Sequence, residues 1–97
     1  MFIQVIEFRS SKPDEIATLV AGYREASAGK STARRGLLTR SRDDEGGYVN
    51  IVFFDSYEEA MSNSELPETS AFAEKMMALC DGPPTFHNLD VVVDEQM

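Results

Sequence analysis

Apolar and polar residues alternate along four stretches of the chain, which predicts β-strands because successive strand side chains point to opposite faces. The clearest stretches are residues 2–8 and 48–54, and the pattern returns at residues 85–93. Residues 34–42 alternate more weakly and carry arginines late in the run, as is typical of a protected edge strand. The sequence DDEGG at 43–47 is a turn, so the second and third strands are expected to form an antiparallel hairpin.

Between the first and second strands the apolar spacing becomes helical. Ser11 and Asp14 stand at capping-box positions and Pro13 suits a first helical turn, so a helix is expected to begin here with Ser11 as its cap. Apolar residues then recur at i, i+3, i+4 and i+7, at Ile16, Leu19, Val20 and Tyr23. Ala28 and Gly29 are the expected end of this helix.

The second helical region is predicted to be broken in two. Ser56 and Glu59 form an S-x-x-E capping box ahead of a short helix, and Pro67 opens a further helix that ends before Gly82. The resulting order is β-α-β-β-α-β, the ferredoxin-like split βαβ pattern of the α+β class. We therefore predict a single domain over residues 1–97, with four antiparallel strands and helices on one face.

The other face of this sheet would keep apolar residues from several strands, and monomers rarely expose patches of that size. A symmetric homodimer is the simplest arrangement that covers it. The chain has 97 residues, a size at which burial of surface is adequate but not generous, so association with a second copy would add stability.

Charge and composition narrow the function classes. The net charge is −8, which disfavours nucleic-acid binding because phosphate backbones are also negative. Positive charge gathers in the first 42 residues, where Lys30, Arg34, Arg35, Arg40 and Arg42 form either a solvated hairpin face or a weak site for a small anion.

One cysteine, Cys80, excludes an internal disulfide and a cysteine-type metal site, and its apolar surroundings predict an unreactive thiol. The single histidine and the scattered carboxylates provide no metal-ligand set. No run of about 20 apolar residues and no signal peptide are recognised, so we expect a cytoplasmic protein without a membrane span.

Three strands each carry one polar residue in an otherwise apolar row: Gln4, Asn50 and His87. The first and third strands of this fold are central neighbours and the fourth flanks the first, so these side chains are expected to converge. Buried amides and imidazoles are either paired with each other or available to a ligand. His87 is the only side chain suited to acid–base work near neutral pH, although a single histidine is also a common structural residue.

The segment FFDSYEEA at 53–60, followed by the Pro67 helix with Phe72, resembles the antibiotic-biosynthesis-monooxygenase (ABM) type of the dimeric α/β-barrel superfamily. The resemblance covers nearly the whole chain, including the first strand, the Pro13 helix and the hairpin. It implies that two four-stranded sheets combine into a dimeric α/β barrel. Proteins of this superfamily include quinol and polyketide-quinone monooxygenases, haem-degrading enzymes and members with no known reaction.

Many ABM-type members carry histidines between the broken helices and directly after the proline, where this chain has Asn63 and Glu68. The chain also lacks tryptophan and has no histidine on its second helical region, so haem degradation is not expected. The resemblance instead implies oxygenation of a quinol-like or polyphenolic molecule without cofactor or metal, in a pocket between helices and sheet. The expected catalytic residues are His87, Asn50 and Gln4, and the expected substrate-binding residues are Tyr23, Tyr48, Asn63, Phe72 and Met76.

Two other functions stay open at this point. One is a non-catalytic dimeric module that binds a small apolar or aromatic ligand or is associated with stress, which the absence of the usual histidines favours. The other is an accessory protein whose acidic surface docks a basic partner.

Overall fold

The computed structural model describes all 97 residues. Three helices and four strands follow one another as β1 (Phe2–Arg9), α1 (Pro13–Ala26), β2 (Arg35–Arg40), β3 (Gly47–Phe54), α2 (Tyr57–Ser64), α3 (Pro67–Leu79) and β4 (Thr85–Asp90). This is the predicted order, with the second helical region broken at Pro67 as expected. None of the helices has the length and apolarity that a bilayer crossing requires.

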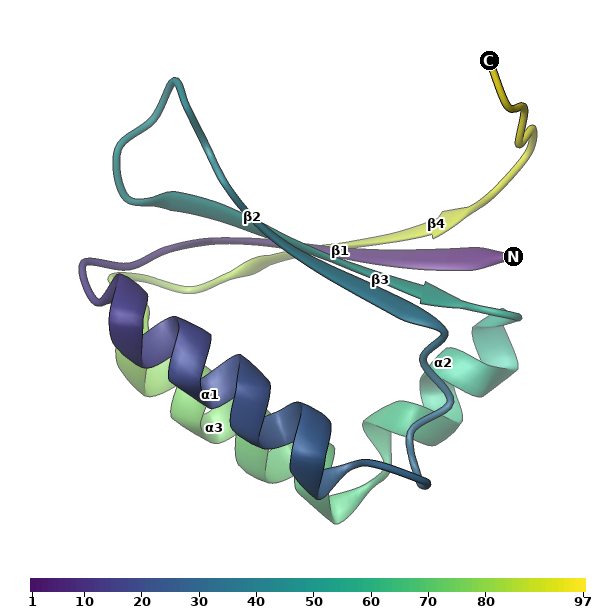
Figure 1. Cartoon of the computed structure of the whole chain (residues 1–97), viewed down its shortest axis with the longest axis horizontal. Coiled ribbons are helices and arrows are strands. Elements are labelled where there is room, and N and C mark those ends of the chain that lie inside the picture. The colour runs from purple at the N-terminus through teal and green to yellow at the C-terminus, as the bar shows by residue number, and fades with distance from the viewer.

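The strands form one antiparallel sheet in the order β2-β3-β1-β4, so β1 and β3 are central neighbours, as predicted. All three helices lie on the same side of the sheet (Figure 1). The other side carries no helix, and both the β2–β3 turn and the C-terminal end of the chain rise on that open side. The structure therefore has the ferredoxin-like α+β fold.

The core on the helix side is divided into two apolar clusters. One contains Phe8, Ile16, Tyr48 and Met76, and the other contains Phe2, Phe54 and Ala60. Even-numbered residues of β1 and β3 supply both clusters, because Phe2 pairs with Phe54 and Phe8 pairs with Tyr48. Gln4 and Asn50 occupy the same helix-facing rows between the clusters and remain half-buried.

The open side of the sheet is formed by the odd-numbered residues of the four strands. Its apolar members are half-buried or exposed although they belong to a continuous sheet: Ile3, Val5, Leu37, Val49, Ile51, Phe53 and Leu89. Leu89 keeps 49% of its surface accessible. A contiguous apolar face of this kind is where monomeric proteins ordinarily meet a partner.

The last strand is shorter than its alternating pattern predicts. β4 ends at Asp90, whereas the pattern continues to Val93. The neighbouring strand β1 begins at Phe2, and the backbone N–H of Val91 already donates to the carbonyl oxygen of Met1. Beyond that point no strand remains for the chain to pair with, and Val92 is 92% exposed.

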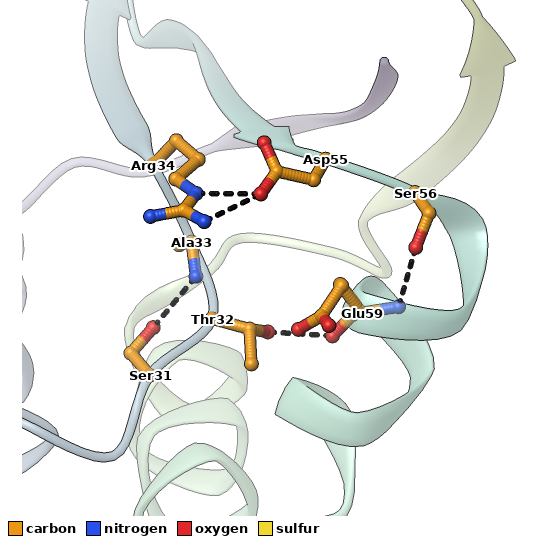
Figure 2. A network of polar contacts seen from close by, with 7 residues as sticks. All are labelled: Ser31, Thr32, Ala33, Arg34, Asp55, Ser56 and Glu59. Atoms are coloured by element: carbon orange, nitrogen blue, oxygen red, sulfur yellow. Dashed lines mark hydrogen bonds and ion pairs between the residues drawn. The ribbon is translucent and has the colours of Figure 1, made fainter.

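The expected cap at Ser11 is also wrong. Helix α1 begins at Pro13 and no side chain caps it. The preceding residue, Ser10, is buried and makes the local hydrogen bonds in place of Ser11. Its Oγ accepts from the N–H of Lys12 at 3.1 Å and donates to the carbonyl oxygen of Leu79 at 2.7 Å. The cap at Ser56 is confirmed, since its Oγ accepts from the N–H of Glu59 at 3.1 Å (Figure 2).

Replacing Ser56 with alanine is expected to lower the free energy of unfolding by about 1 kcal/mol, because one N–H at the start of α2 loses its acceptor. Urea denaturation followed by circular dichroism measures this change. Ser11→Ala is the matched control, because Ser11 is exposed and caps no helix, and it should change the free energy by less than about 0.5 kcal/mol. Equal losses in the two variants would contradict the assignment of the cap.

Candidate functional site

Gln4 and Asn50 lie diagonally across the two central strands, on the side that the helices cover. Gln4 pairs with Val52 and Asn50 pairs with Ile6, so the two amides are close neighbours, as predicted. The Nε2 of Gln4 donates to the Oδ1 of Asn88 at 3.3 Å. The carboxamide of Asn50 makes no hydrogen bond within the chain and, being half-buried, is still reached by solvent. Asn50 is therefore free to bind a ligand atom.

The predicted convergence of His87 with these amides is wrong. His87 pairs with Val5 on β1, so its side chain lies on the open face of the sheet, opposite to Gln4 and Asn50. There its Nε2 is 2.8 Å from Oε2 of Glu7, and the imidazole is 46% exposed. The sequence contains the signal for this pair, because Glu7 is the acidic member of the odd-numbered row of the first strand.

Asn63 and Tyr23 belong to a polar network inside the helical layer. The Oδ1 of Asn63 accepts from Ser31 Oγ at 2.7 Å and from the N–H of Thr32 at 3.3 Å. Its Nδ2 donates to the hydroxyl of Tyr23 at 3.2 Å, and that hydroxyl lies 2.8 Å from Thr69 Oγ1. Asn63 is buried and most of its hydrogen-bonding capacity is satisfied, so this network primarily joins the helices and the segment after α1.

The aromatic and methionine candidates are mostly part of the core. Tyr48 stacks on Phe8 with ring centroids 5.3 Å apart, and both Tyr48 and Met76 are only 8% exposed. Phe72 is half-buried and lies against Tyr23, with ring centroids 4.6 Å apart. Among the aromatic residues predicted to bind substrate, Phe72 and Tyr23 are therefore the two that remain partly accessible. They are the candidates that a flat ligand could reach.

Cys80 packs beside the first cluster and is half-buried. Burial raises the pKa of its thiol, and the carboxylate of Asp81 raises it further. The thiol is thus protonated at neutral pH, which agrees with the unreactive character expected from the sequence. No group of three or more histidine, cysteine, aspartate or glutamate side chains is placed to hold a metal ion.

Two of the five residues of the basic cluster form ion pairs, and a third lies over an aromatic ring. Lys30 Nζ pairs with Glu68 Oε1 at 2.6 Å, and Arg34 Nε donates to Asp55 Oδ2 at 2.8 Å. Figure 2 shows the segment that carries Arg34, where Thr32 Oγ1 also donates to the carbonyl of Glu59 at 2.6 Å. Arg35 lies over the ring of Phe53, 5.8 Å from its centroid. These contacts favour a solvated face over a binding site for a small anion.

The ion pair with Lys30 lowers the pKa of Glu68, chiefly through its hydrogen bond. A lowered folded-state pKa adds stability above the unfolded value of 4.5, and that stability is lost as the pH falls through the folded value. Lys30→Met should therefore be less stable than the native chain at pH 7, and the difference should shrink progressively as the pH falls below 4.5. Urea denaturation at pH 7 and at a series of pH values below 4.5 measures the difference in the free energy of unfolding. Lys75 forms no ion pair, so Lys75→Met is the control. A difference that does not change with pH would contradict the contribution of the ion pair.

A surface depression lies elsewhere, at the end of the sheet where β1 meets the β2–β3 turn. It encloses about 550 Å³ and is lined mainly by polar and acidic groups that include Arg9, Asp44 and Asp81. Arg9 is held there by Asp44 and by the carbonyl oxygen of Glu45 at 2.7 Å. Neither Gln4 nor Asn50 lines this depression, so it is separate from the amide pair.

No family model and no curated protein sequence matches this chain. Solved structures do match it over nearly their whole length. SnoaB, a cofactor-independent oxygenase from Streptomyces nogalater, is 20% identical with a TM-score of 0.82, covering 96% of this chain and 94% of SnoaB. A mutant of SnoaB gives 19% identity, a TM-score of 0.83 and the same coverage.

Two further structures extend the likeness. An antibiotic biosynthesis monooxygenase is 14% identical with a TM-score of 0.78, covering 96% of this chain and all of that one. Rv0793 from Mycobacterium tuberculosis is 16% identical with a TM-score of 0.76, covering 99% of this chain and all of Rv0793. At such identities the likeness concerns the fold, and it confirms the resemblance found in the sequence: this chain has the fold of the antibiotic-biosynthesis-monooxygenase type.

Proposed function

We propose that this protein is a cofactor-independent monooxygenase acting on a quinol-like or polyphenolic small molecule. The observation that carries the proposal is the carboxamide of Asn50, which is half-buried between two apolar clusters and has no hydrogen-bond partner in the chain. An unpaired amide in a partly buried position is costly unless a ligand or water meets it. The fold shared with the oxygenase SnoaB supports the same assignment.

In the proposed reaction the substrate supplies all the electrons. An electron-rich ring with an acidic CH₂ loses a proton to solvent, and the N–H groups of Asn50 and Gln4 stabilise the negative oxygen of the resulting anion. The carbanion form of the anion bonds to one oxygen atom of O₂, and the peroxide takes up a proton. The O–O bond then breaks, leaving C=O on the ring and releasing water. The balance is CH₂ + O₂ → C=O + H₂O, with no other reductant.

We propose in addition that a second copy of the chain covers the open face of the sheet. Support comes from the apolar residues of that face, which include Val5, Ile51 and Leu89 and which leave a small domain with few fully buried side chains. His87 and Glu7 would then lie at the interface between the copies rather than beside the amides. In this arrangement His87 has a structural role in pairing.

A non-catalytic module that binds a small ligand is the second candidate. The observation that favours it is the network of Asn63 and Tyr23, in which the polar groups of the helical layer are already engaged with each other. Such groups hold the fold together and take no part in proton transfer. The same amide pair at Gln4 and Asn50 would then only bind the ligand.

Oxygen consumption with a panel of hydroquinones and anthrones distinguishes the two candidates. The native protein should accelerate oxygen uptake above the buffer rate, and Asn50→Ala should lower kcat/KM about 100-fold because the anion loses a positioned donor. Gln96→Ala, which removes an exposed carboxamide near the C-terminus, is the control and should leave the rate unchanged. Uptake equal to that of buffer across the panel would reject the oxygenase and leave the binding module.

A further inference from the structure

We infer that the pair formed by His87 and Glu7 makes the association of two copies through the open face depend on pH, with the homodimer favoured when His87 is protonated. The inference rests on the homodimer of the proposed function, because it assigns a regulation to that interface. A second copy is the occupant of the open face, and a proton on His87 is the condition for tight docking.

The charges of the chain are unevenly distributed between its two sides. Helices α1, α2 and α3 together carry seven carboxylates and two basic residues. The odd-numbered strand residues of the open face include one carboxylate, Glu7, and two arginines, Arg9 and Arg35. Two copies with a net charge of −8 each repel one another, and this repulsion is smallest where the two open faces meet. Charge and apolar character therefore both favour contact between open faces.

His87 and Glu7 form a polar pair within the apolar part of this face. Nε2 of His87 lies 2.8 Å from Oε2 of Glu7, and the two side chains are 46% and 55% exposed. Val5 pairs with His87, and Val49 pairs with Glu7. Leu89 follows in the same row of β4. A second copy that covers Val5 and Leu89 therefore also covers the pair.

Glu7 has no other cation to balance its charge. Arg9 is the only other charged residue in its row of β1, and Arg9 is bound to Asp44. Glu7, Asp44 and Asp81 line the same depression, where three carboxylates face one arginine. The negative charge of Glu7 is therefore compensated only when His87 carries a proton.

No other group that titrates near neutral pH contacts this pair. Asp90 is the other ionisable residue of β4, and its pairing with Phe2 places it on the helix side. The remaining charged groups of the open side lie at the opposite end of the sheet, where β1 begins (Figure 1): the amino terminus, Arg35, Asp94 and Glu95. His87 is also the single histidine of the chain, so its proton can be followed without interference from another imidazole.

The proton on His87 decides whether covering the pair is costly. Protonated His87 and ionised Glu7 form a neutral ion pair with a charge-assisted hydrogen bond. Neutral His87 leaves Glu7 as a carboxylate without a cation, and burial of such a charge opposes association. Association therefore takes up protons wherever the imidazole is neutral in the single copy, so the dissociation constant rises with pH. Because imidazoles in water titrate near about pH 6.5, the rise should fall within roughly pH 6–8.

The test measures the dissociation constant of the native chain by sedimentation equilibrium at about pH 6 and about pH 8, at constant ionic strength. The constant should rise about 10-fold or more, because each of the two copies releases up to one proton when the homodimer dissociates. Dilution calorimetry in two buffers with different ionisation enthalpies counts the released protons independently.

Two substitutions separate the pair from general charge repulsion. His87→Gln keeps an N–H donor for Glu7 but does not titrate, so its dissociation constant should change less than about 3-fold between the two pH values. Glu7→Gln should reverse the direction of the change, because protonated His87 then becomes the buried charge without a partner. Glu74→Gln removes an exposed carboxylate from α3 and is the matched control, which should keep the native pH dependence. Circular dichroism at both pH values checks that each variant is folded.

The outcomes separate the pH dependence from the homodimer itself. A homodimer with the same dissociation constant at both pH values overturns the inference and leaves the homodimer in place. A pH dependence that persists in His87→Gln overturns the assignment to this pair. A native chain that stays monomeric at both pH values rejects the homodimer and the inference together, whereas oxygen uptake decides separately whether the protein is an oxygenase.

Discussion

Replacing Met76 with alanine is expected to lower the free energy of unfolding by about 2–5 kcal/mol, because it leaves a cavity in the larger apolar cluster. Met76 is 8% exposed and packs with Phe8, Ile16 and Tyr48. Small domains are stable by only about 5–15 kcal/mol in total, so this single change removes a large share of the stability. Thermal denaturation at a fixed protein concentration should show a melting temperature lower by about 10 °C or more.

The adjacent residue provides the control. Met77 lies on the same helix but is 61% exposed, so Met77→Ala makes the same chemical change without opening a cavity. Its effect should stay within about 0.5 kcal/mol. Similar losses in both variants would show that Met76 is not a core residue, and would return it to the set of ligand-binding candidates on the helix side.

Replacing Ile51 with glutamate is expected to convert the proposed homodimer into a folded monomer. Ile51 lies on the open face of β3, between Val5 of β1 and Leu37 of β2. In a symmetric pair the change would bury two carboxylates without partners, and each uncompensated charge costs about 3–5 kcal/mol. The dissociation constant should therefore rise at least about 100-fold, as measured by sedimentation velocity over a range of concentrations.

Met77→Glu is the matched control for this experiment, because it places the same charge on the exposed surface of α3. It should leave the oligomeric state unchanged. Circular dichroism should show that Ile51→Glu keeps its secondary structure, since the open face is accessible to water in a single copy. A native chain that sediments as a monomer at micromolar concentration would reject the homodimer altogether.

Much of the fold could be predicted because each element is marked by short-range features. The S-x-x-E sequence at Ser56 and the proline at Pro67 determine where α2 and α3 begin, through local hydrogen bonds and backbone geometry. The alternation in β1 and β3 identifies the residues that share a face. Even-numbered residues of these two strands contribute to both core clusters. Gln4 and Asn50 could be chosen as site candidates on the same grounds.

The sequence by itself determined the order of the elements and the rows within each strand, whereas the tertiary structure decided which row of β4 faces the helices. Both rows of that strand contain apolar residues, so periodicity could not choose between them; the pairing of Val5 with His87 did. That register sends His87 to the open face and brings Asn88 beside Gln4. Contacts between residues 80 or more positions apart in the sequence are set by how strands pair, which no local pattern encodes.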